Sequence, residues 1–76
     1  MTDGIELDKY IKVSGKKFGY AKYTCYVYVR KDIPKKVTRD DVAAFVDGYS
    51  KNFGYKMIRV ESKGNYAKYE MTIYID

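Results

Sequence analysis

Apolar and polar residues alternate along four short stretches of the chain, at 9–13, 20–30, 56–60 and 66–75. Such alternation predicts β-strands, because successive side chains of a strand point to opposite faces of a sheet. A polar segment rich in Gly, Lys and Ser joins the first two stretches at 14–19, and another joins the last two at 61–65. The pattern therefore predicts two β-hairpins.

A helical pattern lies between the hairpins. The segment 32–34 ends the second strand, because Pro34 cannot donate to a strand ladder. Thr38 is a suitable N-cap, and Asp41 stands where a capping box places an acid. Apolar residues then recur at helical spacing as one stripe, formed by Val42, Phe45, Val46, Tyr49 and Phe53. Gly54 is the expected C-cap, and Gly48 is expected to mark a close approach of the helix to the sheet.

The two predicted hairpins are similar in sequence. The string Tyr-Ala-Lys-Tyr occurs at 20–23 and again at 66–69, each time directly after the polar segment. The stretches before it, 9–13 and 56–60, and after it, 26–29 and 72–75, are also alike. An identical string at the same place favours a duplicated hairpin over chance similarity between β-forming segments.

The element order β-β-α-β-β predicts an α+β fold in a single domain, 1–76, with one helix on one face of a four-stranded antiparallel sheet. The stretches 20–30 and 66–75 are the longest and most apolar, so we expect them at the centre of the sheet. This arrangement gives the strand order 1-2-4-3. The order 2-1-3-4 is also antiparallel and stays an alternative.

Alternation assigns the strand residues to two faces. The face expected to meet the helix contains Leu7, Ile11, Val13, Ala21, Tyr23, Cys25, Val27, Val29, Ile58, Val60, Ala67, Tyr69, Met71, Ile73 and Ile75. The other face, which one helix cannot cover, contains Tyr10, Lys12, Tyr20, Lys22, Thr24, Tyr26, Tyr28, Arg30, Tyr55, Met57, Arg59, Glu61, Tyr66, Lys68, Glu70, Thr72 and Tyr74. Seven of the 10 tyrosines are thus expected on the uncovered face.

Composition narrows the classes of partner and compartment. The formal net charge is +5, which favours a polyanionic partner, and tyrosine supplies nearly all of the aromatic content. No apolar stretch is long enough to span a membrane, and the first residues lack the pattern of a signal peptide. A single cysteine, Cys25, excludes an internal disulfide. We therefore expect a cytoplasmic protein.

Tyrosines interleaved with lysine and arginine on an open sheet are typical of proteins that stack bases and neutralise phosphates. We therefore predict a surface that binds nucleic acid, as a single strand or through its backbone. The predicted interface consists of Tyr10, Lys12, Lys16, Lys17, Tyr20, Lys22, Tyr26, Tyr28, Arg30, Tyr55, Arg59, Lys63, Tyr66, Lys68 and Tyr74.

Three other interpretations stay open. The first is a protein partner, including a complex that handles nucleic acid, because Tyr and Arg are enriched at interaction hot spots. Phage-encoded proteins that block host defence complexes, anti-CRISPR proteins among them, have this size and lack catalytic residues. The second is a homodimer that buries the tyrosine-rich face, since monomers rarely expose so large an aromatic area. The third is a solvated face without a partner, because Tyr and Thr favour strands wherever they point.

The sequence offers little for catalysis. Histidine is absent, and one cysteine cannot form a thiolate metal site. Asp40 and Asp41 are adjacent, so on a helix they point about 100° apart and form no catalytic pair. The segment 15–17 lacks the flanking residues of a phosphate-binding loop. We therefore expect a non-catalytic protein without cofactor or metal, and RNA cleavage by Tyr, Lys and Arg alone is the remaining enzymatic alternative.

Overall fold

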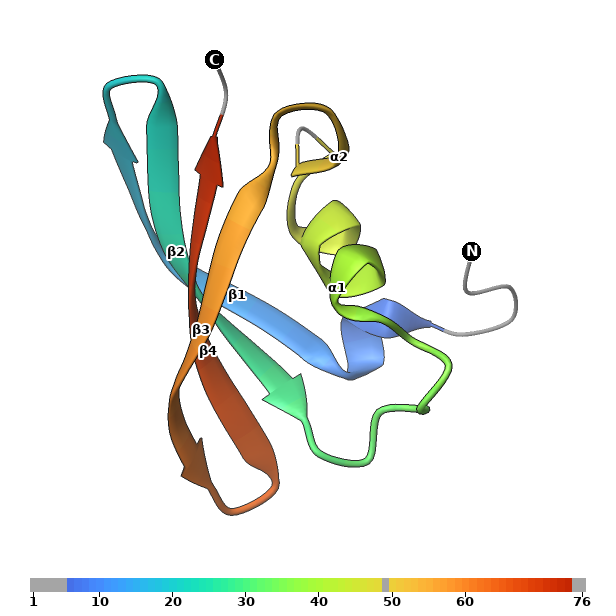
Figure 1. The fold of residues 1–76 in the computed structure, drawn as a ribbon. Helices are drawn as coiled ribbons and strands as arrows, with labels where there is room; N and C mark the ends of the chain where they lie inside the picture. Colours follow the sequence, from blue (N-terminus) through green and yellow to red (C-terminus); the bar gives the residue numbers. More distant parts are fainter. Residues whose placement is uncertain (1–5, 49, 75–76) are drawn as a thin grey trace.

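The computed structural model describes residues 6–48 and 50–74, which form four strands, two helices and one 3₁₀ turn (Figure 1). In chain order the elements are η1 (Leu7–Lys9), β1 (Ile11–Gly19), β2 (Lys22–Arg30), α1 (Arg39–Val46), α2 (Ser50–Phe53), β3 (Tyr55–Lys63) and β4 (Tyr66–Tyr74). The strands form one sheet in the order β1-β2-β4-β3, and every neighbouring pair is antiparallel. The predicted α+β fold and the favoured strand order are confirmed.

The central strands β2 and β4 supply most of the core. Their alternate residues face the helices, so Cys25, Val27, Met71 and Ile73 are almost inaccessible to solvent. The core also buries Ile11, Tyr23, Val29, Val42, Ala43 and Met57. Cys25 lies directly opposite Met71, which is its counterpart in the sequence repeat. The two hairpins therefore meet symmetrically about this pair.

Each hairpin turns through two residues. Gly19 pairs with Lys22, which leaves Tyr20 and Ala21 in the first turn, and Lys63 pairs with Tyr66 across the second. The predicted polar tips, 14–19 and 61–65, are thus largely strand. Their polar composition is typical of loops, but β1 and β3 are edge strands with much of their surface in water, where polar side chains are equally suitable.

The prediction assigned the first residues of β3 to the wrong faces of the sheet. Met57 pairs with Met71 and is 8% exposed, whereas Ile58 is 45% exposed on the opposite side. The pairing register shifts between Arg59 and Glu61, so Val60 is an extra residue of a β-bulge. Tyr55 and Arg59 are two residues before and after Met57, so they share its helix face. The sequence places apolar residues on both faces of this strand, and alternation alone could not locate the bulge.

The predicted helix is divided into two. Thr38 and Asp41 form the expected capping box, with hydrogen bonds of 3.0 and 3.1 Å between their backbone and side-chain atoms. α1 ends at Val46, before the extended residue Asp47, and a second short helix follows. The N–H of Gly54 donates to the Ser50 carbonyl at 3.1 Å, which agrees with its predicted capping role.

The apolar stripe of the helix differs from the prediction. Val42 is buried and Val46 is half-buried, as predicted. Ala43, which was not predicted to face the core, is fully buried, whereas the predicted core residue Phe45 is not. Phe45 and Phe53 are exposed. The break at Asp47 interrupts the helical periodicity before Phe53, whereas Phe45 precedes the break and lies on the solvent side of α1 itself. No atom outside its immediate surroundings lies within 4 Å of a Cβ placed on Gly48, so the expected close approach to the sheet is wrong. The predictions for Tyr49 and Ile75 lie outside the described residues.

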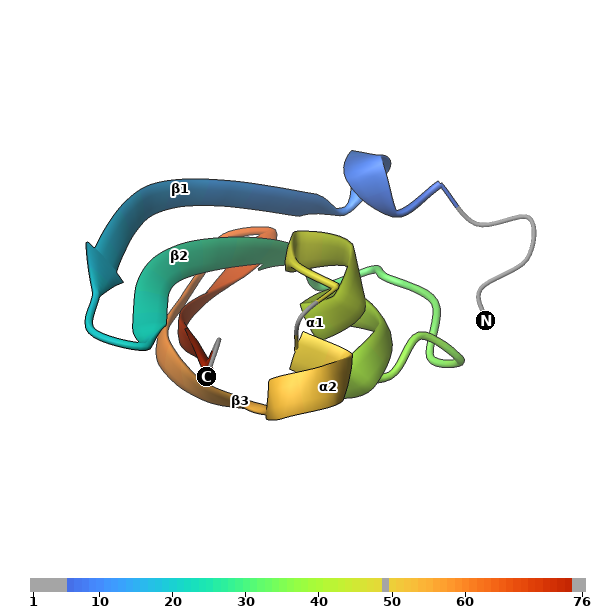
Figure 2. The ribbon, with the colours of Figure 1, turned by 90° about the horizontal axis from the view of Figure 1, so that it is seen from above.

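Two tyrosine hydroxyls of the sheet form hydrogen bonds to the two ends of α1. Tyr23 of β2 and Tyr55 of β3 flank Ile73 of β4 in one row of paired residues. The Tyr55 hydroxyl donates to Asp40 at the start of α1 (2.6 Å), and the Tyr23 hydroxyl donates to Asp47 at its end. Seen from above, the sheet curls around both helices and leaves its other face uncovered (Figure 2).

Candidate functional site

The sheet surface turned away from α1 and α2 is called the open face here. Its residues follow from the strand registers: Lys12, Ser14, Lys17 and Gly19 of β1, Lys22, Thr24, Tyr26, Tyr28 and Arg30 of β2, Lys56, Ile58, Glu61 and Lys63 of β3, and Tyr66, Lys68, Glu70, Thr72 and Tyr74 of β4. The two central strands place four of their six tyrosines here, and the edge strands contribute mainly lysine.

The charge of the molecule is concentrated on this surface. Seven basic residues of the open face, from Lys12 to Lys68, stand against only Glu61 and Glu70. Their formal sum equals the net charge of +5 for the whole chain. The rest of the sequence is therefore formally neutral, and the open face is a positive surface on a balanced molecule.

Lys68 lies at the centre of this surface, over two tyrosine rings. Its Nζ atom is 4.5 Å from the ring centroid of Tyr26 and 5.6 Å from that of Tyr28. Such contacts hold an ammonium group by attraction to the electron-rich ring faces, at about 0.5–1 kcal/mol each when exposed. The rings therefore orient a positive charge toward solvent, which reduces the area of Tyr26 and Tyr28 that is free for stacking.

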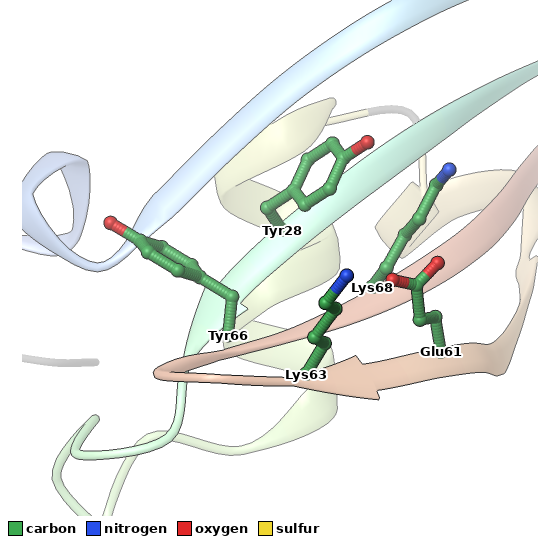
Figure 3. Close-up of a pocket in the computed structure, with 5 residues that line it drawn as sticks. All are labelled: Tyr28, Glu61, Lys63, Tyr66 and Lys68. Carbon is green, nitrogen blue, oxygen red and sulfur yellow. The ribbon is translucent and has the colours of Figure 1, made fainter.

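A small hollow lies beside Lys68 (Figure 3). Its volume is about 50 Å³, and it is lined by Tyr28, Glu61, Lys63, Tyr66 and Lys68. Figure 3 shows the Lys63 and Lys68 side chains extending from neighbouring strands toward the same side as the Tyr28 ring. The hollow is far smaller than the roughly 300 Å³ or more of ligand pockets, so it suits water or a single small group held between two cations.

Arg30 marks the end of the open face nearest to η1. Its guanidinium lies 5.4 Å from the ring centroid of Tyr10 and makes two hydrogen bonds to Asp32, of 2.6 and 3.0 Å. This pairing with a carboxylate raises the pKa of Arg30 and offsets part of its charge. Arg30 therefore orders this end of the sheet. The lysines of the open face, which form no ion pair within residues 6–48 and 50–74, supply the remaining positive charge.

Most of the predicted interface residues are brought together by the structure. Tyr10 lies beside Arg30, and the open face itself contains Lys12, Lys17, Lys22, Tyr26, Tyr28, Arg30, Lys63, Tyr66, Lys68 and Tyr74. Edge and central strands thus contribute to one continuous surface. The position of these residues is as predicted, and their role stays a prediction.

Four predicted residues lie elsewhere. Tyr55 and Arg59 are on the helix face because of the strand parity of β3 described above. Lys16 stands at the bulge of β1 and places its Nζ atom 5.7 Å from the ring centroid of Tyr23, also on the helix side. Tyr20 occupies the β1–β2 turn and is 94% exposed. These are corrections to the predicted interface. Lys16 and Tyr20 follow from a bulge and a turn, and Tyr55 and Arg59 follow from Met57, not Ile58, being the core residue of β3.

Lys56 belongs to the open face although the pattern did not assign it there, and Phe18 is an exposed aromatic residue on the helix side of the sheet. Lys56 pairs with Thr72 on the open face. Assigning Met57 to the core would have predicted this position for Lys56. Phe18 is 77% exposed near the β1–β2 turn, with its ring centroid 5.3 Å from that of Tyr23. With Tyr20 it makes the projecting end of this hairpin aromatic.

The sequence matches no protein-family model, and searches of curated proteins and of solved structures find no match. Within residues 6–48 and 50–74, no helix is long and apolar enough to cross a membrane.

Proposed function

We propose that the protein is a non-catalytic, cytoplasmic nucleic-acid-binding protein, and that the open face contacts the phosphate backbone. The observation that supports this most is the charge distribution, because the formal charge of the open face alone equals the +5 of the chain. A surface of this kind attracts a polyanion by releasing its counterions, without reading base sequence.

The arrangement of the tyrosines favours backbone contacts over stacking at the middle of the open face. Lys68 covers parts of the Tyr26 and Tyr28 rings, so these rings serve to position a charge. Rings that are more accessible lie toward the β1–β2 turn, where Tyr74 is paired with Lys22 and Tyr20 projects into solvent. We infer that unpaired bases stack at this end while the lysines follow the phosphates.

A protein partner or a homodimer is the alternative use of the same surface. Lysine is depleted at the hot spots of protein interfaces, and lysine is the commonest residue of the open face. The charge density therefore favours a polyanion over a neutral protein surface and opposes close contact between two copies.

The test is a titration of fluorescently labelled oligonucleotides at low salt, read by fluorescence anisotropy. Single-stranded DNA, single-stranded RNA and duplex of equal length are compared. The variant Lys12→Glu/Lys56→Glu reverses two exposed charges on the open face, one on each edge strand. The matched control is Lys35→Glu/Lys36→Glu, which makes the same change at exposed positions in the segment between β2 and α1.

We expect the wild type and the control to bind, and the open-face variant to lose about 100-fold in affinity, since each reversed charge removes a phosphate contact and adds repulsion. Equal losses in both variants would refute the assignment to this face. If none of the three oligonucleotides binds the wild type at low salt, the proposal is wrong, and the mass of the protein in solution then distinguishes a homodimer from a monomer.

A further inference from the structure

The helices leave part of the other sheet face uncovered. Hydrogen bonds from Tyr23 and Tyr55 connect α1 to the row that these two residues form with Ile73. In Figure 1, α1 and α2 lie beside the middle and upper parts of the sheet. The β3–β4 turn projects beyond the helices at the lower end of the same view. Between the two ends lies a hollow of about 450 Å³, called the lower hollow here, which falls within the range of small-ligand sites.

The floor of the lower hollow is apolar and aromatic. It consists of Val29, Ala67 and Tyr69 from the central strands and Ile33 from the segment after β2. Tyr69 and Tyr23 occupy equivalent places in the two hairpins. The Tyr23 hydroxyl is bonded to Asp47 under α1, whereas the hydroxyl of the half-buried Tyr69 makes no hydrogen bond within the described part of the chain. Its ring and hydroxyl are therefore available to a ligand.

The rim of the lower hollow is positively charged. Arg59 stands across from Tyr69 on β3, and Lys31 follows β2. Neither forms an ion pair among the described residues, whereas the neighbouring Arg30, which also lines the hollow, is paired with Asp32. The Lys31 N–H donates to the Asn65 carbonyl at 2.8 Å, which ties this part of the rim to the β3–β4 turn. Two uncommitted cations thus border an apolar floor that carries one aromatic ring.

We propose that the lower hollow binds a nucleotide, with the base against Tyr69 and the phosphate between Arg59 and Lys31. The volume admits a ligand of this size, the apolar floor favours a flat ring, and the rim complements an anion. The same chemistry has two sources, a free nucleotide and the 5′-phosphorylated end of a strand. The proposal does not rest on the proposed function, because the apolar floor, Arg59 and Lys31 all lie outside the open face. Arg30 borders both surfaces.

The experiment follows the amide signals of the isotope-labelled protein by NMR during titration with adenosine 5′-monophosphate. Adenosine and inorganic phosphate are titrated separately, since each has only half of the proposed chemistry. A tetranucleotide with and without a 5′-phosphate distinguishes a strand end from a free nucleotide. We expect shifts centred on Val29, Ser62 and Ala67, with the nucleotide binding at least tenfold more tightly than adenosine or phosphate.

Variants locate the site. Arg59→Gln and Lys31→Gln are each expected to weaken nucleotide binding about tenfold. Lys36→Gln, at an exposed position outside both the lower hollow and the open face, should leave it unchanged. Tyr69→Leu removes the aromatic ring and should also weaken nucleotide binding. If the Tyr69→Leu variant does not fold, the two charge variants still test the proposal. Absence of shifts with both the mononucleotide and the phosphorylated strand would overturn the proposal. Shifts confined to the open face, or phosphate alone binding equally well, would also overturn it.

Discussion

At the scale of single residues, the hydroxyl of Tyr23 connects the core to the end of α1. The side chain is buried, and its hydroxyl donates to the carboxylate of Asp47. Hydrogen bonds to charged groups contribute about 1.5–3 kcal/mol to stability. We expect Tyr23→Phe to lower the free energy of unfolding by about 2 kcal/mol, measured by urea titration. Tyr28→Phe, on the open face, should change it by less than about 0.5 kcal/mol, and equal effects would contradict this account.

Tyr55 makes stability depend on alkaline pH. Burial, and next the hydrogen bond to Asp40, raise the pKa of Tyr55 to about 12. Because the ordinary value is about 10, the folded state holds this proton more tightly than the unfolded state. The associated stabilisation is complete below about pH 10 and is lost as the pH rises toward 12.

Urea titrations from pH 8 to pH 11.5 should therefore show stability falling above about pH 10. The fall should be shallower in Tyr55→Phe, which lacks the titrating group, and it should persist in part because the pKa of Tyr23 is also raised by burial and by Asp47. A pH dependence identical to that of the wild type would show that the Tyr55 contact does not form.

Gly15 is required by the bulge of β1. Its φ is +66°, and a Cβ there would lie 3.1 Å from the ring atom Cδ2 of Tyr26. An alanine would therefore adopt a left-handed conformation, at about 1–2 kcal/mol, and would also displace the ring. Gly64 has a similar φ of +59° with nothing within 4 Å, so Gly64→Ala is a matched control for the backbone strain alone.

We expect Gly15→Ala to destabilise the protein by about 1 kcal/mol more than Gly64→Ala, because only the first substitution also moves Tyr26. Thermal or urea unfolding of the two variants gives the difference. Equal destabilisation would mean that Tyr26 does not pack against the bulge.

At the scale of elements, the face of β3 is the feature that sequence reasoning assigned wrongly. Met57→Ala removes a buried side chain and should lower the free energy of unfolding by about 2–4 kcal/mol. Ile58→Ala shortens a side chain that is 45% exposed and should lower it by less than about 1 kcal/mol. Urea titration of both variants decides the register, since the reverse order of effects would restore the original assignment.

The elements that the sequence predicted correctly are those specified by local chemistry. The capping box of Thr38 and Asp41 fixes the start of α1, and the alternation from Tyr23 to Val29 fixes β2 because the strand is central and one face is buried. The end of α1 at Asp47 depends on the distant Tyr23, and the bulges depend on cross-strand pairing. Neither signal is local in sequence.

The candidate interface was predicted in part for the same reason. Residues of β2 and β4 fell on the expected face, whereas Lys16 and Tyr20 were displaced by a bulge and a turn. Tyr55 and Arg59 were assigned to the wrong face because Met57, not Ile58, is buried. Lys56 was missed because it neighbours Met57 in the strand: once Met57 is placed in the core, Lys56 must point to the open face. Charge composition indicated a polyanionic partner, but only the strand registers place the net charge on one surface.

At the scale of the whole molecule, two different surfaces lie on opposite sides of one thin sheet. The open face is broad and positive, whereas the helix face holds the core at one end and the lower hollow at the other. The proposed backbone-binding face and the proposed nucleotide site thus consist largely of alternate residues of the same strands, with Arg30 at the border of both. Substitutions on one side should leave binding on the other side unchanged.

The central claim is that phosphates bind the open face, and the salt dependence of oligonucleotide binding tests it most directly. The logarithm of the association constant should fall linearly with the logarithm of salt concentration, with a slope set by the number of phosphates contacted. For a single strand, Lys12→Gln/Lys56→Gln should make the slope shallower by about 1.4, while Lys35→Gln/Lys36→Gln should leave it unchanged. A slope that is the same in all three proteins would contradict the claim.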